Sequence, residues 1–226
     1  MSRRARREVS SGAPPDLSQY GVLAEYNRKR RFDVTPEPPG RPGRRAAGGL
    51  AFVVQKHRAT ALHYDVRIEH EGAMLSWAVP KSPSLDPATK RLAMMTEPHP
   101  LDYNGFEGVI PEGEYGGGTV MIWDRGTWKP EVPDVTAALA KGELKLTIQG
   151  HKLRGSWVLV RTRNRQWLMI KHRDRFASTD DVTVKRPLSV VSRRSMAGIA
   201  RAAGATPRQL ELAAAADPPR VSRRVA

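Results

Sequence analysis

Cysteine is absent from the 226 residues of this chain. Its absence excludes disulfides and thiolate metal sites, so a metal ion would have to be held by nitrogen and oxygen ligands. Long apolar runs are also missing, and no apolar stretch follows the basic N-terminus as a signal peptide requires. We therefore expect no membrane span and a cytoplasmic location.

Acidic residues are scarce relative to basic ones: 23 Asp and Glu stand against 38 Lys and Arg, which gives a net charge of +15 and a pI near 10.7. Most of the excess lies in the flanks. Residues 1–45 carry 11 basic and 5 acidic residues, residues 185–226 carry 9 and 2, and the middle is nearly balanced with 18 and 16. The simplest interpretation is solvated tails, but such a balance favours polyanionic partners, above all nucleic acid.

Short apolar segments separated by turn residues dominate the chain from Leu50 to Lys171. Alternation and turn signals predict strands at 51–56, 62–69, 73–79, 91–96, 119–124, 143–148, 153–162 and 166–171. Helices are expected at 17–29, 134–140, 195–203 and 207–216, and the Pro- and Gly-rich segment 98–118 is expected to lack regular structure. The pattern predicts an all-β core, a compact closed or nearly closed β-barrel of about eight strands with a few peripheral helices. A β-sandwich is the alternative.

One expected strand, Leu62–Ile68, carries an unusual set of polar residues. His63, Asp65 and Arg67 alternate with apolar residues, so they share one strand face, at a spacing of roughly 6–7 Å. His57 lies just upstream, in the loop expected after the first strand. Two imidazoles and a carboxylate can hold Mn, Fe or Zn, and the adjacent guanidinium can bind a phosphate.

Further candidates lie on later segments: Lys81 after a strand end, Arg91 at the start of a strand, and His99 and Tyr103 near a proline pair. Arg forks bind phosphate in a bidentate manner, and a His can give a proton to a leaving oxygen. Taken singly, each of these residues is more simply a solvated charge, a loop residue or a packing residue.

Two other features suggest structure rather than chemistry. Residues 110–118 are glycine-rich but lack the Lys-Ser/Thr pair of a nucleotide-binding loop, so we interpret them as a tight turn. The five Trp residues lie on or near expected strands, where core packing is the default role.

The segments FVVQKHRATALHYDVRIEHEG, SWAVPKSPSLDPATKRLAMMTEPHPLDYNGFEGVIPEGEYGGGTVMIWDRGTW and KLRGSWVLVRT resemble the 3′-phosphoesterase domain of bacterial DNA ligase D. The upstream segment YNRKRRFDVTPEP and the later RPLSVVS extend the resemblance from about Leu23 to about Val191. With the composition of the flanks, this predicts three parts: a disordered basic tail at 1–16, a phosphoesterase domain at 17–191, and a helical basic extension at 192–226 with a disordered end. Ligase and polymerase modules are missing, so a stand-alone phosphoesterase is expected.

The resemblance implies a Mn-dependent enzyme, with other divalent metals as substitutes, that processes DNA or RNA 3′ ends in non-homologous end joining. It would remove 3′-terminal ribonucleosides and then 3′-phosphates, leaving 3′-hydroxyl ends. The implied substrate is a primer-template, and the implied protein partners are a separate ligase, a polymerase and Ku-type end-joining proteins. No interaction with a membrane is implied. The implied location is cytoplasmic and nucleoid-associated.

The resemblance also implies residue roles. It makes His57, His63 and Asp65 the metal ligands, and Arg67, Arg91 and His99 the residues that engage the scissile phosphate. Lys81, Tyr103 and Glu37 match further active-site positions. The assignment of Glu37 to the active site depends on the resemblance alone, because the Pro-rich segment around it otherwise indicates a linker.

Two rival functions remain open from the sequence. One is a DNA-end-binding adaptor with the same fold that recruits a ligase or polymerase. The other is a cupin-like metal oxygenase on a small barrel, although nothing in the sequence indicates its iron triad.

Overall fold

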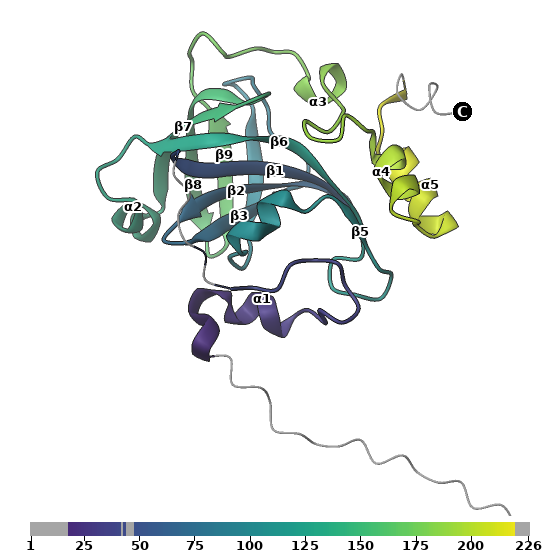
Figure 1. The fold of residues 1–226 in the computed structure, drawn as a ribbon. Helices are drawn as coiled ribbons and strands as arrows, with labels where there is room; N and C mark the ends of the chain where they lie inside the picture. The colour runs from purple at the N-terminus through teal and green to yellow at the C-terminus, as the bar shows by residue number, and fades with distance from the viewer. Residues whose placement is uncertain (1–17, 42, 44–47, 220–226) are drawn as a thin grey trace, which may run out of the picture.

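The computed structural model describes residues 18–41, 43 and 48–219 as a β-barrel with helices around it (Figure 1). Its strands are β1 (Leu50–Arg58), β2 (Leu62–His70), β3 (Ala73–Val79), β4 (Lys90–Met95), β5 (Gly108–Ile110), β6 (Gly118–Pro130), β7 (Glu143–Gly150), β8 (Arg154–Arg163) and β9 (Gln166–Lys171). The sheet order is β1-β2-β3-β4-β9-β8-β7-β6-β5, every pairing is antiparallel, and β1 also pairs with β6. Eight strands therefore close into a barrel, and β5 is an extra strand at its edge. The predicted all-β barrel of about eight strands is confirmed, and the sandwich is excluded.

The alternation read from the sequence explains the two faces of β2. Tyr64, Val66 and Ile68 belong to the main core inside the barrel, so the intervening residues point outward. The β2–β3 hairpin turns at Glu71 and Gly72, whose φ angles of 48° and 78° match a two-residue turn with both central residues left-handed. This turn fixes the register that places His63, Asp65 and Arg67 on the outer face.

All five Trp side chains are buried and belong to the main core, as predicted. They lie on β3, β6, β8 and β9, so they fill the interior from several strands around the barrel wall. Large aromatics dominate core energetics because each removes 150–250 Å² from water, as a rough general figure. The barrel is thus a filled core, and chemistry is confined to its outer surface and ends.

Two expectations about the site region were wrong. His57 does not lie in a loop, since β1 continues to Arg58 and places His57 opposite His63. The segment 98–118 is not wholly irregular, because it contains the 3-10 helix η2 (Leu101–Gly105) and strand β5. Both elements pack against the outer face of the sheet through residues such as Leu101 and Ile110.

The helices lie around the barrel. They are the 3-10 helix η1 (Ser18–Leu23), α1 (Ala24–Arg28), α2 (Val135–Lys141), α3 (Val182–Lys185), α4 (Met196–Ala202) and α5 (Pro207–Ala215). α2, α4 and α5 are confirmed with the N-cap residues Asp134, Ser195 and Thr206. The expected helix at 17–29 is a 3-10 turn followed by α1, and α3 was not predicted. Within the described ranges, no helix is long and apolar enough to cross a membrane.

The C-terminal helices contribute to the main core through Met196, Ile199 and Ala213. Asp217, expected in a disordered end, is buried and accepts hydrogen bonds from the backbone amides of Met196 and Ala197. The expected disordered tail at 1–16 and residues 220–226 lie outside the described residues, and the domain boundary at 191 stays a prediction.

One edge of β6 is paired with β5 at residues 118–120 and with β7 at residues 126–130. Between these pairings the strand bonds to loops. The Ile122 amide donates to the Glu107 carboxylate, and the Ile122 carbonyl accepts from the Val190 amide. The segment that follows α3 therefore lies against the barrel at this gap.

Candidate active site

The outer face of β1 and β2 carries a cluster of polar side chains that is largely buried. His57 and Gln55 of β1 lie opposite His63 and Asp65 of β2, and Arg67 follows on the same face of β2. Asp65 and Arg67 are only 6% and 3% exposed. Burying an ionised group without a partner is costly, so the partners of these side chains determine what the cluster can do.

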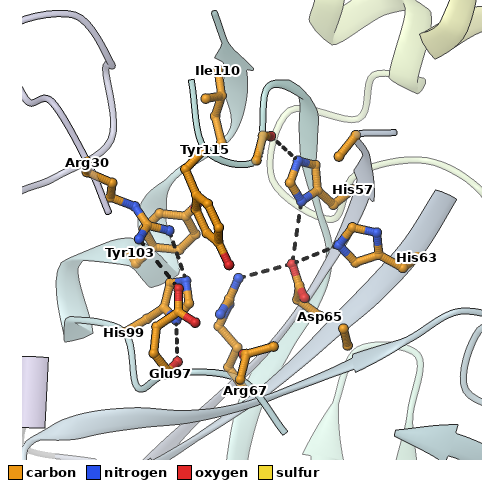
Figure 2. A pocket seen from close by; sticks show the side chains of 14 residues that line it. Arg30, His57, His63, Asp65, Arg67, Glu97, His99, Tyr103, Ile110 and Tyr115 are labelled. Carbon is orange, nitrogen blue, oxygen red and sulfur yellow. Dashed lines mark hydrogen bonds and ion pairs between the residues drawn. The ribbon is translucent and has the colours of Figure 1, made fainter. Parts of the chain in front are cut away.

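His57, His63 and Asp65 converge on one point (Figure 2). Asp65 Oδ2 lies 3.7 Å from His57 Nδ1 and 3.6 Å from His63 Nε2, and the three ligand atoms lie within 4.8 Å of one another. Two imidazole nitrogens and a carboxylate oxygen at this spacing could hold one divalent metal ion of the Mn, Fe or Zn type.

The outward nitrogens of both imidazoles are held by backbone carbonyls. His57 Nε2 donates to Gly116 O at 2.8 Å, and His63 Nδ1 donates to Ala61 O at 3.0 Å. In these tautomers the other nitrogen of each ring turns its lone pair toward Asp65. Two lone pairs and a carboxylate oxygen that face one another repel unless a cation lies between them. A carbonyl that accepts from the other ring nitrogen is typical of metal-binding histidines, so the residues fit a metal ion.

Arg67 is the positive neighbour of this cluster. Its guanidinium donates to Asp65 Oδ2 at 3.1 Å, to Gln55 Oε1 at 2.9 Å and to the Ser76 hydroxyl. Burial would raise the pKa of Asp65, but the Arg67 guanidinium holds it well below its usual value. Asp65 is therefore ionised, and Arg67 is fixed in orientation at the edge of the metal-ligand set.

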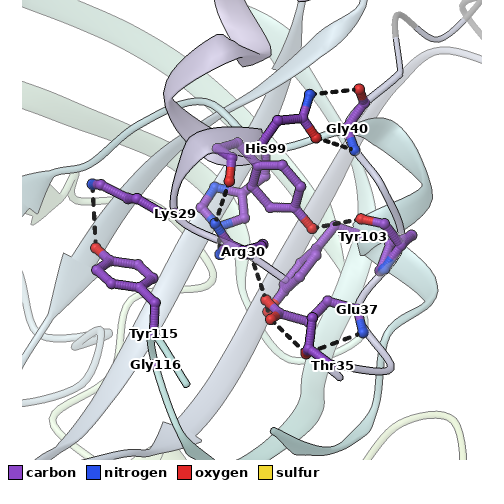
Figure 3. A network of polar contacts seen from close by, with 12 residues as sticks. Lys29, Arg30, Thr35, Glu37, Gly40, His99, Tyr103, Tyr115 and Gly116 are labelled. Atoms are coloured by element: carbon purple, nitrogen blue, oxygen red, sulfur yellow. Dashed lines mark hydrogen bonds and ion pairs between the residues drawn. The ribbon is translucent and has the colours of Figure 1, made fainter. Parts of the chain in front are cut away.

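A second buried network joins the N-terminal segment to this site (Figure 3). Arg30 Nε donates to Glu37 Oε1 at 2.8 Å, and Glu37 also accepts from the hydroxyls of Thr35 at 2.8 Å and Tyr103 at 3.0 Å. The Arg30 guanidinium lies over the Tyr26 ring, 3.7 Å from its centroid. Glu37 thus fixes an arginine and a tyrosine at the wall of the site.

His99 lies between the two networks. Its Nδ1 donates to Glu97 O at 2.9 Å, and its Nε2 lies 3.3 Å from Arg30 Nη2, which can only donate. Burial, together with Arg67 and Arg30, lowers the pKa of His99 well below its usual value. In this state His99 is a neutral imidazole whose acceptor nitrogen is engaged by Arg30.

Tyr115 borders the same space from the glycine-rich turn. Its side chain is 49% exposed, which is unusual for an aromatic ring beside a buried cluster. Lys29 Nζ lies 4.8 Å from the ring centroid and bonds the Tyr115 hydroxyl at 3.4 Å. The turn predicted at 110–118 therefore carries an accessible ring at the opening of the site and the carbonyl of Gly116 that holds His57.

The structure brings six of the nine predicted site residues to one cavity of about 260 Å³, and three lie outside its lining. His57, His63, Asp65, Arg67, His99 and Tyr103 line it. Glu37 lies one shell behind, bonded to Tyr103 and Arg30.

Lys81 and Arg91 do not line the cavity. Lys81 is exposed beyond the end of β3. Arg91 pairs in register with Met169, a core residue, so its side chain starts toward the inner face of β4. Its Nε is buried and has no hydrogen-bond partner among the described residues.

Four lining or bracing residues were missed from the sequence: Gln55, Arg30, Glu97 and Tyr115. Gln55 could have been found, because it precedes His57 by two residues and therefore shares its strand face. Arg30 and Tyr115 had no such signal, since Arg30 follows the short helix α1 and Tyr115 lies on a turn, and the approach of both to β2 depends on the tertiary fold.

Known proteins are similar to much of this chain. A sequence model of the DNA ligase D 3′-phosphoesterase domain matches residues 55–161. The chain is 51% identical over 182 residues to a multifunctional non-homologous end joining protein LigD of Pseudomonas aeruginosa, covering 77% of this chain and 22% of that protein.

Two further LigD proteins are similar. The one from Mycolicibacterium smegmatis is 38% identical over 157 residues, covering 67% of this chain and 21% of its own length. The one from Mycobacterium tuberculosis is 41% identical over 146 residues, covering 65% and 19%. The chain thus spans about a fifth of the length of these relatives.

The matched region contains six residues that line the cavity: His57, His63, Asp65, Arg67, His99 and Tyr103. The fold and the site define the class of protein as a small β-barrel that carries a histidine–aspartate cluster on its outer face. The chain belongs to the DNA ligase D 3′-phosphoesterase domain family.

Proposed function

We propose that this chain is a Mn-dependent phosphoesterase that removes 3′-terminal ribonucleosides and 3′-phosphates from nucleic acid ends and leaves 3′-hydroxyls. The observation that carries the proposal is the arrangement of His57, His63 and Asp65 beside Arg67 in one cavity. A metal site alone would fit many reactions. An arginine fixed at its edge adds the recognition element for a phosphate.

His57, His63 and Asp65 would hold the metal ion, and the metal ion supplies a Lewis acid for a phosphoryl oxygen when bound. Nitrogen and carboxylate ligands without a thiolate suit Mn. The carbonyls of Gly116 and Ala61 keep the two imidazoles in the tautomers that this role needs.

Arg67 and Arg30 would stabilise the charge that grows on the phosphate oxygens. Both guanidiniums are already held in place by carboxylates, through Asp65 and Glu37. Preorganised charge of this kind is usually the largest contribution to phosphoryl transfer, because nothing has to reorganise as the reaction proceeds.

Hydrolysis of a 3′-phosphate forms a bond from a water oxygen to phosphorus and breaks the bond to the 3′ oxygen, which takes up a proton. His99 lies between the two arginine networks and is neutral in the free protein. A bound phosphate would add negative charge beside it and raise its pKa. We assign His99 the delivery of the proton to the leaving oxygen once the phosphate has engaged Arg30.

The roles expected for Arg91, at the scissile phosphate, and for Lys81, at a further active-site position, stay predictions, since neither residue lines the cavity. The proposed setting is end joining, with a separate ligase, a polymerase and a Ku-type protein as partners, as the names of the LigD relatives suggest.

A labelled primer-template that ends in a 3′-phosphate or in one 3′-ribonucleotide tests the proposal. With Mn, both ends should be converted to 3′-hydroxyl, and a chelator should stop the conversion. Binding of the duplex without any Mn-dependent conversion would overturn the enzyme assignment and favour an end-binding adaptor.

A further inference from the structure

A second hollow, of about 250 Å³, lies at the gap in the pairing of β6, and no residue lines both it and the catalytic cavity. Four of its lining residues are cationic: Lys152, Lys185, Arg186 and Arg193. No carboxylate lines it. We call these four residues the basic pocket. In Figure 1 they lie at the start of β8 and along the segment from α3 to α4.

Lys152 is the buried member of the basic pocket, at 8% exposed. Its ammonium donates to Leu188 O at 2.6 Å and lies 4.4 Å from the centroid of the Trp123 ring. The nearest carboxylate, Asp124, is occupied by the backbone amides of Arg125, Lys152 and Leu153. No ion pair between Lys152 and an acid within 4 Å occurs in the described chain.

The other three cations are exposed at the rim. Arg186 donates to His151 O, and Lys185 pairs with Asp180. The Arg193 guanidinium makes no hydrogen bond or ion pair within the described residues, and its backbone has a φ of 63°, which is uncommon for a side chain of this size. Burial lowers the pKa of Lys152 to about 7, and Arg186 and Arg193 add to the effect against Asp124. Apart from Lys185, the cations of the basic pocket thus take part in no ion pair within the described residues.

The loop that carries these cations is well fixed. Val190 bonds Ile122 of β6, and the Ser189 hydroxyl accepts from the amides of Val191 and Ser192. Trp123 Nε1 donates to Arg186 O at 3.0 Å. Because the backbone is held by these bonds, an anion would meet side chains that are already in position.

The position of the basic pocket suits an extended polyanion. The backbone amide of Lys152 donates to Asp124 of β6. Asp124 lies four residues along β6 from Val120, and Val120 pairs with His57, one of the proposed metal ligands. Four residues of strand span about 13 Å. Since base pairs of a duplex rise about 3.4 Å each, a duplex held by its end in the catalytic cavity would have phosphates within reach a few base pairs away.

We propose that the basic pocket binds a backbone phosphate of the nucleic-acid substrate, a few nucleotides from the end that is processed. This proposal rests on the proposed function, because it assumes that a nucleic acid end occupies the catalytic cavity. Arg186 and Arg193 would bind the phosphate oxygens at the rim, and Lys152 would contribute charge from below.

The test compares the double substitution Arg186→Ala/Arg193→Ala with the control Lys129→Ala/Arg163→Ala. The control removes two exposed cations from the far end of β6 and from the β8–β9 hairpin, where no ion pair among the described residues involves them. Affinity for a 3′-hydroxyl duplex, which undergoes no chemistry, is measured by fluorescence anisotropy across a salt series. The pocket variant should bind about tenfold more weakly. Its slope of log affinity against log salt should be smaller by about 1. Affinity and slope equal to those of the control would overturn the proposal and leave an acidic protein segment as the better occupant.

Turnover of a dinucleotide with a 3′-phosphate, too short to reach the basic pocket, separates this proposal from the proposed function. The pocket variant should match the wild type on it. Absence of turnover in the wild type would refute the proposed function, while the duplex measurements would still decide the pocket. A loss of dinucleotide turnover specific to the pocket variant would contradict the assignment, because it would connect the pocket to the chemistry.

The indole N–H resonance of Trp123 distinguishes a backbone phosphate from a free anion, since it is bonded to Arg186. The duplex should shift this resonance at stoichiometric concentration in the wild type and not in the pocket variant. A shift caused by inorganic phosphate but not by the duplex would show an anion site unrelated to nucleic acid and overturn the proposal.

Discussion

The catalytic cavity and the basic pocket both gather cationic side chains, and they differ in how those cations are neutralised. In the catalytic cavity Arg67 is paired with Asp65, and Arg30 with Glu37. In the basic pocket no carboxylate lines the hollow, and neither Lys152 nor Arg193 forms an ion pair within the described residues. Cations that are paired with carboxylates are held rigidly and suit the stabilisation of a transition state. Cations without a carboxylate partner bind an anionic ligand with less selectivity. The comparison suggests that one site performs chemistry and the other contributes affinity.

The largest expected effect comes from breaking the metal-ligand set. Asp65→Asn removes the charge that both histidines face and the partner of Arg67. Losing several kcal/mol of charge stabilisation should lower Mn-dependent conversion of a 3′-phosphate end by about a thousandfold or more. The matched control is Asp102→Asn, an exposed aspartate on η2. Activity within a few fold of the control would remove Asp65 from the site.

Glu37→Gln tests whether the second network positions the phosphate clamp. Arg30 would lose the closer of its two carboxylate partners, while Glu97 at 3.7 Å and the proposed metal ligands stay in place. We expect kcat to fall by up to about a hundredfold, the usual range for outer-shell partners. Mn affinity, measured by calorimetry, should not change. A fall in Mn affinity with unchanged kcat would place Glu37 with the metal instead.

Lys171 is a buried lysine that has a carboxylate partner, unlike Lys152. It lies near the Trp157 ring and donates to Asp174. Asp174→Asn should lower the free energy of unfolding by about 2 kcal/mol at neutral pH, because a buried ammonium loses its charged partner. Burial would raise the pKa of Asp174, but the bond from Lys171 and two backbone amides lower it.

A lowered native pKa means that this contribution is present above the ordinary pKa of an aspartate and is lost as the pH falls through the lowered one. Urea unfolding at several pH values checks the sign. The difference between the wild type and Asp174→Asn should shrink toward acid, and a difference that grows toward acid would contradict the assignment.

Tyr115→Ala carries the smallest predicted effect on turnover. The exposed ring at the opening of the cavity can stack on the terminal base, and such stacking is worth roughly 1–3 kcal/mol. KM for a 3′-phosphate end should rise by about tenfold with kcat little changed. Tyr115→Phe, which keeps the ring, should restore KM. If the phenylalanine variant behaves like the alanine variant, the hydroxyl bonded by Lys29 is the group that matters.

The sequence predicts well what depends on strand alternation. His63, Asp65 and Arg67 share an outer face because a strand alternates, and the barrel follows from short segments with turns between them. His57 was placed in a loop because the predicted strand ended at residue 56, two residues before the end of β1. That error also hid Gln55, which lies on the same face.

What the sequence does not predict depends on distant contacts. Arg30 reaches the cavity, and Glu37 lies directly behind it, because an irregular segment crosses the outer face, and neither residue follows a periodic pattern. The resemblance supplied Glu37, but not Arg30. The basic pocket was invisible for a similar reason, since Lys152 and Arg193 meet only where a loop closes the gap beside β6.

Titration of the protein with Mn, followed by electron paramagnetic resonance and calorimetry, tests the central claim most directly. The wild type should bind one ion, and binding should be lost in both His63→Ala and Asp65→Asn while Asp102→Asn binds as the wild type does. Equal Mn binding by all four proteins would contradict a metal site at His57, His63 and Asp65.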